Sequence, residues 1–186
     1  MMLKQIPNAL TIIRLLLVLP FLVCLFHHQF VFSFYIFVIA GVTDALDGWL
    51  ARGFAWQSNF GKLLDPMADK LLIAASFLSL AILSVLPWWL VILVFARDLT
   101  ISLGVIAWYL WMPNKPDLKP TYISKVNTVM QLTLVMMTLC VQAFEFHIPL
   151  LLQLCLILTA VTTTASFIDY VWTWGRKACH QTTCLR

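Results

Sequence analysis

The segment FVFSFYIFVIAGVTDALDGWLARGFAWQSNFGKLLDPMAD, residues 30–69, carries the two features that decide the fold. It opens with a long apolar run and then places four aspartates, Asp44, Asp47, Asp65 and Asp69, close to further apolar sequence. A run of about 20 apolar residues is the length that an α-helix needs to cross a bilayer. Ionisable residues are costly inside such segments, so their presence indicates a functional site.

The whole chain has the composition of a membrane protein. Of its 186 residues, 62% are hydrophobic and 11% are charged, whereas soluble domains are about 45–50% apolar and about 25% charged. This composition argues strongly against a water-soluble fold. The net charge of +4 is modest, which favours contact with anionic lipid headgroups and argues against nucleic-acid binding.

Six apolar segments with short breaks predict an all-α, polytopic membrane protein with six transmembrane helices. We expect the helices at residues 8–27, 30–49, 64–83, 88–111, 123–144 and 148–172. No internal repeat or long linker divides the chain. Residues 1–175 are therefore expected to form one membrane domain, followed by a short cytoplasmic tail at 176–186.

The basic residues predict the orientation, because short cytoplasmic loops are enriched in Lys and Arg. Such residues occur near both termini and in the second and fourth connections, whereas the first, third and fifth connections contain none. Both termini are therefore expected in the cytoplasm. We accordingly predict a multi-pass protein of the inner (cytoplasmic) membrane, with its active site toward the cytoplasmic side.

The four aspartates are expected to share one site. Asp44 and Asp47 are three residues apart and Asp65 and Asp69 are four apart, and both spacings return a side chain to the same helical face. Because the two segments are expected to run antiparallel through one cytoplasmic turn, two carboxylates from each helix can converge at similar depth.

Four facing carboxylates stay ionised in a low-dielectric site only with cations between them. An all-oxygen ligand set without nearby His or Cys favours hard ions, so we expect two ions of Mg²⁺ or Mn²⁺, with Ca²⁺ as a further option. Two such ions can hold a pyrophosphate and stabilise the attacking and leaving oxygens of a displacement at phosphorus.

Small residues and one cation accompany the aspartates. Gly48, Ala51 and Gly61 would leave room for a nucleotide to approach the backbone, and Arg52 would place a guanidinium where phosphate oxygens lie. The alternative is that the small residues only let helices pack closely. Because four carboxylates lie nearby in the sequence, we favour the interpretation that these small residues make room for a nucleotide.

The run Asp44-x2-Asp47-Gly48-x2-Ala51-Arg52-x8-Gly61-x3-Asp65-x3-Asp69 resembles, without a gap, a known family signature. It is the signature D-x2-D-G-x2-A-R-x8-G-x3-D-x3-D of the CDP-alcohol phosphatidyltransferases. The resemblance implies that the four aspartates ligate a metal pair and that Asp69 is also the base for the acceptor hydroxyl. It further implies that Gly48, Ala51, Arg52 and Gly61 line the CDP site and that the protein is a six-span homodimer.

The flanking segments resemble particular members of the family. Residues 6–14, IPNALTIIR, are similar to the opening of both phosphatidylglycerophosphate synthases and eukaryotic-type cardiolipin synthases, a resemblance that assigns Asn8 and Thr11 to the CDP site. Arg97-Asp98 and residues 118–131, LKPTYISKVNTVMQ, resemble the cardiolipin synthases. Glycerophosphate-using relatives commonly have Arg-Glu and Gly-Lys-x-Lys-Thr there. This resemblance implies transfer of a phosphatidyl group from CDP-diacylglycerol to phosphatidylglycerol, giving cardiolipin and CMP.

Arg14, Arg97 and Lys125 are cations on three different predicted helices, so they can surround an anionic acceptor phosphate. Together with Asn127, which lies in the resembling stretch, they are the predicted acceptor-binding residues. The alternative for Arg97 is a structural pair with Asp98. Adjacent helical residues point about 100° apart, so we expect that pairing to be geometrically poor.

Three alternatives remain open at the level of sequence. Phosphatidylglycerophosphate synthesis from glycerol 3-phosphate needs the same core signature. A divalent-cation transporter would also keep carboxylates inside its helices, although the acids here gather toward one side and no inverted repeat is seen. A structural subunit would need no matched set of four acids.

Overall fold

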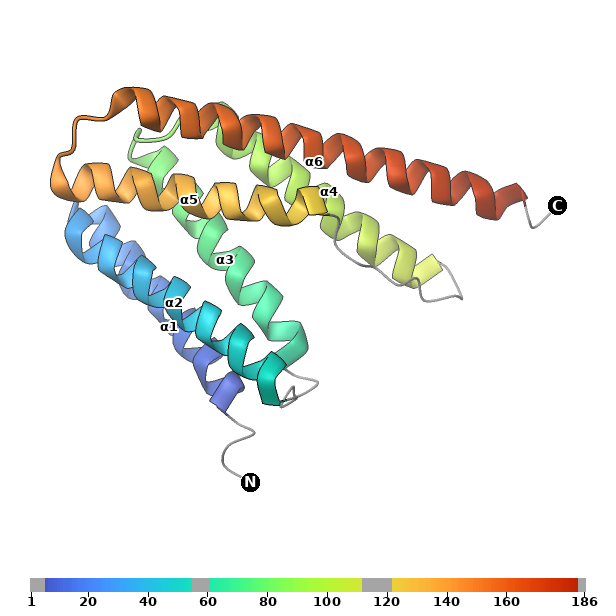
Figure 1. Cartoon of the computed structure of the whole chain (residues 1–186), viewed down its shortest axis with the longest axis horizontal. Helices are drawn as coiled ribbons and strands as arrows, with labels where there is room; N and C mark the ends of the chain where they lie inside the picture. Colours follow the sequence, from blue (N-terminus) through green and yellow to red (C-terminus); the bar gives the residue numbers. More distant parts are fainter. Residues whose placement is uncertain (1–5, 55–60, 112–121, 184–186) are drawn as a thin grey trace. The chain divides into compact units, whose positions relative to one another are not determined.

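The computed structural model describes the backbone of residues 6–54, 61–111 and 122–183, and the side chains of 13–43, 70–104 and 122–172. All its described elements are helices: α1 (Ile6–Phe26), α2 (Phe30–Phe54), α3 (Gly61–Ile82), α4 (Trp88–Trp111), α5 (Tyr122–Phe144) and α6 (Pro149–Thr183) (Figure 1). The predicted all-α class and the six helices are confirmed.

Two helices continue beyond their predicted ends. Helix α2 reaches Phe54 and α6 reaches Thr183, so residues 176–183 of the predicted tail are helical. Hydropathy marks only the part of a helix that suits hydrocarbon. Good helix formers such as Ala51, Arg176, Lys177 and Ala178 extend the backbone helix past that part.

Two of the helices are long and apolar enough to cross a membrane by length and composition, within the part of the chain that the structure describes. They are residues Tyr122–Phe144 of α5 and residues Pro149–Trp172 of α6. The described apolar stretches of the first three helices are shorter, at Ile13–Phe26, Phe30–Thr43 and Lys70–Ile82.

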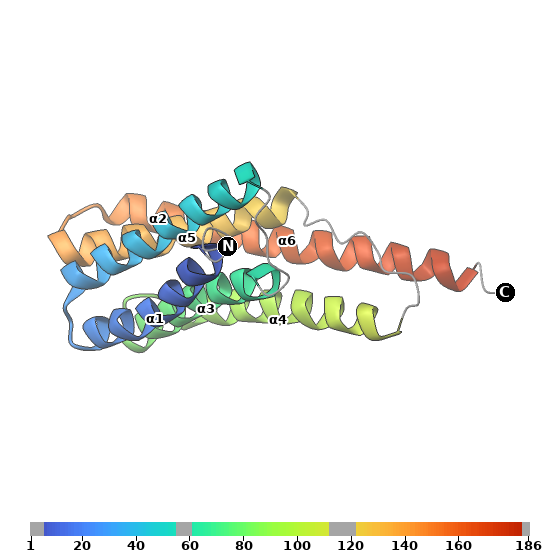
Figure 2. The same ribbon diagram turned by 90° about the horizontal axis from the view of Figure 1, so that it is seen from below.

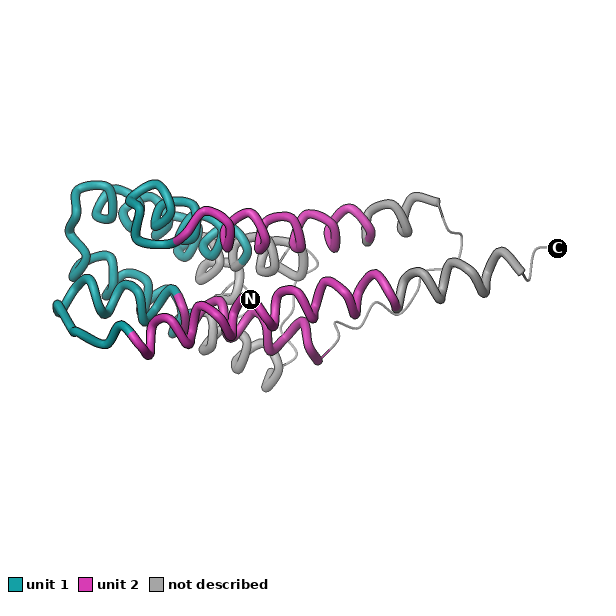
Figure 3. Tube along the Cα trace, turned by 90° about the horizontal axis from the view of Figure 1, so that it is seen from above, with its two compact units in different colours: residues 1–86, 135–149 teal, residues 87–134, 150–186 magenta. Residues whose placement is uncertain are grey.

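The chain divides into two compact units (Figure 3). The first contains residues 1–86 and 135–149, and the second contains residues 87–134 and 150–186. In the first unit, α1 lies alongside both α2 and α3 (Figures 1 and 2). Phe21 of α1 is fully buried and its ring centroid lies 6.0 Å from that of Phe37 on α2, so apolar side chains hold these helices together.

Many large apolar side chains point outward from both units. Leu19 is 64% exposed in the first unit, and Ile92 and Leu99 are each 64% exposed in the second. Soluble monomers rarely expose extended apolar surface. Together with the buried polar residues described below, this arrangement suits helices whose outer faces contact lipid.

Three helices end at a residue with left-handed backbone geometry. His28, Ser84 and Glu145 follow α1, α3 and α5 and have φ angles of 57°, 58° and 52°. At Ser84, the N–H of Ser84 donates to Ala81 O at 2.9 Å and the N–H of Val85 donates to Leu80 O at 2.9 Å. This pair of bonds is a Schellman motif, which usually has glycine at the left-handed position.

Ser84→Gly is therefore expected to stabilise the protein. The left-handed conformation costs an L-residue about 1–2 kcal/mol, and the greater flexibility of glycine offsets only part of that gain. We expect the midpoint of thermal unfolding in detergent to rise by about 2–4 °C. Ser84→Val should lower the midpoint, and a lower midpoint for Ser84→Gly would contradict the left-handed assignment.

Candidate active site

The four predicted metal-binding aspartates all lie on helices. Asp44 and Asp47 fall within α2, and Asp65 and Asp69 fall within α3, so the backbone has the periodicity on which the one-face prediction rests. Both helices belong to the first unit. The convergence of the four carboxylates stays a prediction, because their side chains lie outside the described residues.

The predicted CDP-binding residues also lie outside the described side chains. Their backbone positions are nevertheless helical: two are near the start of α1, three are in the last part of α2, and one is the first residue of α3. These residues are Asn8, Thr11, Gly48, Ala51, Arg52 and Gly61. Their roles accordingly rest on the sequence.

Arg14 is the predicted acceptor-binding residue of the first unit. It lies on α1 and is only 1% exposed. A cation enclosed in an apolar helix is costly to keep, which is typical of a functional position. Because Arg97, Lys125 and Asn127 belong to the second unit, a site shared by all four stays a prediction.

Arg97 is the centre of a polar cluster that links α4, α5 and α6 of the second unit. Its Nη2 donates to Ser124 Oγ on α5 at 2.6 Å and to Ser166 Oγ on α6 at 2.7 Å. Its Nε donates to the same Ser166 oxygen at 3.2 Å. Arg97 is 4% exposed. Its hydrogen bonds to two hydroxyl groups connect α4 to α5 and α6. We call Arg97, Asp98, Ser124 and Ser166 the arginine cluster.

The expectation that Arg97 and Asp98 pair poorly is wrong. Arg97 Nη1 donates to Asp98 Oδ1, and the two groups form an ion pair with side-chain exposures of 5% and 28%. The 100° between neighbouring Cα–Cβ bonds does not prevent the contact, since the long arginine stem can curve back to a short carboxylate. The pair neutralises one charge of the predicted acceptor site.

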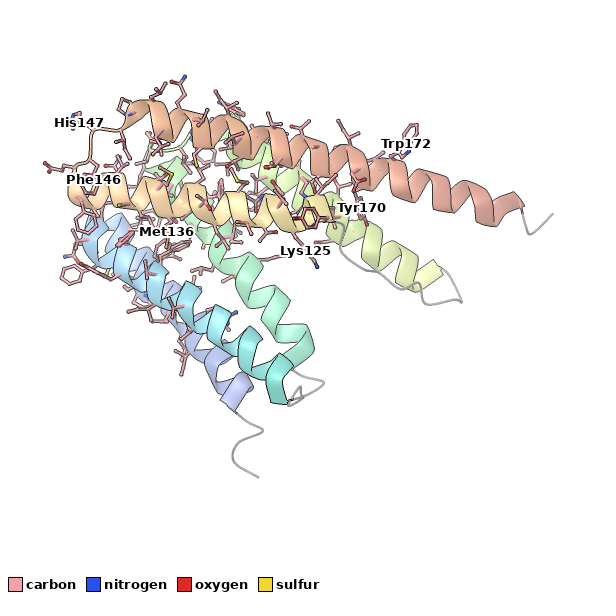
Figure 4. All side chains as sticks on the ribbon, viewed as in Figure 1. Lys125, Met136, Phe146, His147, Tyr170 and Trp172 are labelled. Atoms are coloured by element: carbon pink, nitrogen blue, oxygen red, sulfur yellow. The ribbon has the colours of Figure 1, made fainter. Side chains whose placement is uncertain are left out.

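Lys125 follows Ser124 directly and is exposed. Figure 4 shows it near the beginning of α5. The ammonium group of Lys125 therefore lies one residue from the arginine cluster along the chain, and it is accessible. Binding of the acceptor by Lys125 stays a prediction.

Asn127 connects α5 to α6 and is fully buried. Its Oδ1 accepts hydrogen bonds from Thr162 Oγ1 at 3.1 Å and from Thr163 Oγ1 at 2.8 Å. One turn further, Gln131 is 2% exposed. Among the described residues, neither Asn127 Nδ2 nor Gln131 Nε2 has a hydrogen-bond partner. The structure thus places Asn127 in a helix contact, and direct binding of the acceptor by Asn127 stays a prediction.

Tyr170 closes the contact between α4 and α6. Its hydroxyl donates to the carbonyl oxygen of Ile101 at 3.1 Å. The phenol passes so close to Gly104 that a Cβ atom there would lie 2.6 Å from the Tyr170 oxygen. Glycine at position 104 is therefore required by this approach, which lies beyond Arg97 and Ser166 along the two helices.

Gly104→Ala is expected to destabilise the second unit, because the methyl group must displace a hydrogen-bonded phenol. Overpacking of this kind costs about 1–3 kcal/mol, which should lower the midpoint of thermal unfolding by several degrees. Gly41→Ala is the matched control, since a Cβ atom at Gly41 would meet nothing within 4 Å.

The double variant Gly104→Ala/Tyr170→Phe tests whether the clash with the Tyr170 hydroxyl, and not a general intolerance of alanine at position 104, causes the loss of stability. Removing the hydroxyl removes the atom that the new methyl group meets, so part of the lost stability should return. An equal loss in the single and double variants would show that Tyr170 is not the obstacle.

Sequence analysis overlooked the hydroxyl groups of the cluster. The signal was present as a polar stripe on an apolar helix: Thr159, Thr163, Ser166 and Tyr170 recur at intervals of three or four residues along α6, which is one helical face. Ser124, Asn127 and Gln131 form the corresponding stripe on α5.

Comparison with known proteins decides the family. The family model described as CDP-alcohol phosphatidyltransferase matches residues 4–168. The chain belongs to the CDP-alcohol phosphatidyltransferase family. The match includes the whole aspartate signature and the arginine cluster, and it ends within α6.

Three named proteins are similar over most of the chain. The human cardiolipin synthase (CMP-forming) is 36% identical over 189 aligned residues, which cover 92% of this chain and 62% of the human protein. A probable phosphatidylglycerophosphate synthase of Mycobacterium tuberculosis is 31% identical, with 90% and 80% of the two chains covered. The CDP-diacylglycerol–glycerol-3-phosphate 3-phosphatidyltransferase of Salmonella choleraesuis is 35% identical over 69% of this chain and 72% of its own.

Proposed function

We propose that this member of the CDP-alcohol phosphatidyltransferase family is a cardiolipin synthase. It would transfer the phosphatidyl group of CDP-diacylglycerol to phosphatidylglycerol and release CMP. The observation that carries the proposal is the 36% identity to human cardiolipin synthase over 92% of the chain. The resembling flanks, including Arg97-Asp98 and residues 118–131, support the same acceptor.

The residues of this chain suit such a transfer. Asp69 would remove the proton of the acceptor hydroxyl. The hydroxyl oxygen then attacks the phosphorus of the phosphatidyl group, and the bond from this phosphorus to the CMP oxygen breaks. Arg52 would hold the pyrophosphate, and Gly48, Ala51, Gly61, Asn8 and Thr11 would line the nucleotide site. Arg14, Arg97 and Lys125, with Asn127, would bind the acceptor phosphodiester.

The donor set fits a pair of hard metal ions. Asp44, Asp47, Asp65 and Asp69 offer only oxygen ligands, and their helical spacing in α2 and α3 allows two carboxylates per helix to face one way. Two Mg²⁺ or Mn²⁺ ions, or Ca²⁺, held there would neutralise charge on the pyrophosphate and on the leaving oxygen.

We also propose that all six helices cross the inner membrane, with both termini and the active site on the cytoplasmic side, and that the protein is a homodimer. The distribution of Lys and Arg supports the orientation. The test uses a variant in which the five native cysteines are replaced by serine; a single cysteine is introduced at Lys4 or at Gln29 and treated with a membrane-impermeant maleimide on intact cells. Only the Gln29 variant should react.

Phosphatidylglycerophosphate synthesis is the second candidate function. The similarity to the Mycobacterium tuberculosis and Salmonella choleraesuis proteins favours it, since the name of the latter gives glycerol 3-phosphate as its acceptor. Transport of divalent cations has no support among the proteins compared.

One experiment separates the two enzymes. Purified protein is incubated with CDP-diacylglycerol and Mg²⁺ or Mn²⁺, together with either phosphatidylglycerol or glycerol 3-phosphate, and the lipid products are resolved. Cardiolipin formation from phosphatidylglycerol supports the proposal. Phosphatidylglycerophosphate as the sole product would establish the second candidate, and the absence of CMP release in both reactions would argue against either.

A further inference from the structure

Two buried amides on α5 carry hydrogen-bond donors for which the described part of the chain provides no acceptor. Asn127 is fully buried and Gln131 is 2% exposed. Asn127 Oδ1 accepts from two threonine hydroxyls of α6, yet neither Asn127 Nδ2 nor Gln131 Nε2 has a partner among the described residues. Buried polar groups without partners are costly and rare in native proteins. This indicates that a bound molecule supplies the acceptor.

The two amides lie on one face of α5, directly beyond the arginine cluster. Positions 127 and 131 are one helical turn apart. They follow Ser124 by about 4.5 Å and about 10.5 Å along the helix axis, from the helical rise per residue. Helical side chains lean toward the N-terminus of their helix, so the long Gln131 side chain brings its amide back toward Asn127. Both amide groups are therefore expected in the short interval that follows the arginine cluster.

This order of groups matches the order of groups in a diacyl glycerophospholipid. With the start of α5 on the cytoplasmic side, as proposed, Lys125 comes first and the two amides follow. The helix then continues with the largely apolar run LTLVMMTLCV, residues 132–141. A diacyl lipid has its phosphate at the water interface, two ester carbonyls a few bonds deeper, and then its acyl chains. Ester carbonyls only accept hydrogen bonds, and amide nitrogens only donate them.

We propose that Gln131 and Asn127 bind the ester carbonyl oxygens of a diacyl glycerophospholipid substrate through their amide groups. The inference rests on the proposed function, which places the acceptor phosphodiester at Arg97 and Lys125, and it adds a second region of contact with the same lipid. Phosphatidylglycerol is the expected lipid. CDP-diacylglycerol has the same two esters, so the test includes both substrates. Because a glutamine side chain has several rotatable bonds, the Gln131 amide can turn toward a bound lipid without movement of the backbone.

Gln131→Met tests the proposal, because methionine is similarly long and unbranched and lacks only the amide. Purified enzyme is assayed with phosphatidylglycerol and with its dialkyl ether analogue, in which methylene groups replace both ester carbonyls. The variant should have a kcat/KM for the diester that is about 2- to 10-fold lower than that of the wild type, which is the value of one neutral hydrogen bond. Its kcat/KM for the diether should be unchanged, since the ether has no carbonyl for the amide to bind.

The same comparison with CDP-diacylglycerol and its dialkyl ether identifies the lipid. A loss confined to the acceptor series assigns the carbonyl to phosphatidylglycerol, and a loss confined to the donor series assigns it to CDP-diacylglycerol. Gln142→Met is the matched control, because it makes the same substitution at an exposed residue of the same helix. It should change neither series. The midpoint of thermal unfolding of Gln131→Met should stay the same or rise, because the variant removes an unpaired buried amide.

An unchanged kcat/KM for every substrate, or equal losses on diester and diether in both series, would overturn the proposal. Either result would mean that the amides hold water or serve packing alone. An unfolding midpoint several degrees lower for Gln131→Met would also overturn it, since Gln131 would then have a partner within the protein. Failure of the proposed function is a different result, namely phosphatidylglycerophosphate in place of cardiolipin among the wild-type products. The donor series, run with glycerol 3-phosphate, still tests the amides in that case.

Discussion

Asp69→Asn is expected to abolish turnover while CDP-diacylglycerol still binds. A positioned general base contributes about 10²- to 10⁴-fold to rate, and asparagine cannot accept the proton of the acceptor hydroxyl. The other three aspartates remain to hold metal and nucleotide. Single-turnover rates, together with binding of CDP-diacylglycerol measured by calorimetry in detergent, check both parts.

The comparison variants are Asp44→Asn and Asp65→Asn, which should weaken metal and nucleotide binding together. High Mn²⁺ should rescue them partially and should leave Asp69→Asn inactive. If Asp69→Asn lost binding as much as rate, a separate role as base would be untenable. Activity without metal in any of the three would contradict the two-ion site.

Arg97→Ala is expected to damage both the acceptor reaction and the fold. Three hydrogen bonds that join α4 to α5 and α6 are lost, and Asp98 is left without its partner. Breaking a buried ion pair costs about 3–5 kcal/mol, so the midpoint of thermal unfolding should fall on the order of 10 °C. Loss of the charged contact to the phosphodiester should lower kcat/KM for phosphatidylglycerol by about 10- to 150-fold.

Lys125→Ala separates the two effects, because Lys125 is exposed. We expect the same acceptor penalty of about 10- to 150-fold, with an unchanged unfolding midpoint. Arg52→Ala should instead raise the KM for CDP-diacylglycerol. If the Arg97 and Lys125 variants impaired donor binding and spared the acceptor, the assignment of acceptor and donor residues would be reversed.

The six helices could be predicted because each contains a long apolar run, and short connections separate these runs. The positions of the helix ends were harder to predict from the sequence. At Ser84 the chain turns through a left-handed residue that is not glycine, which no composition rule marks. Helix α6 continues past its apolar part because helix propensity reports the stability of the helical backbone, whereas hydropathy reports the preference for hydrocarbon over water.

Part of the candidate site could likewise be predicted from the sequence, and part could not. The aspartate signature has fixed spacing and could be read from sequence, as could the cations on separate helices. The arginine cluster could not, because it depends on which hydroxyl groups of α5 and α6 meet Arg97 after packing. The Arg97–Asp98 pair was misjudged because the prediction considered only the directions of the Cα–Cβ bonds and neglected the length of the arginine stem.

The polar stripes of α5 and α6 differ in whether their hydrogen bonds can form within one helix, before the two helices pack together. This difference has a consequence for biosynthesis. The hydroxyls of Thr159 and Thr163 lie 2.8 and 2.7 Å from a carbonyl oxygen one turn earlier on their own helix, so these groups of α6 are already satisfied before α6 meets another helix. The amide of Asn127 has no such local hydrogen bond, because its partners among the described residues, Thr162 and Thr163, are on α6. If α5 and α6 cross the bilayer as proposed, an unsatisfied amide in hydrocarbon is costly, so α5 would be retained beside the translocon until α6 has been synthesised, and the two would enter the lipid as a hairpin.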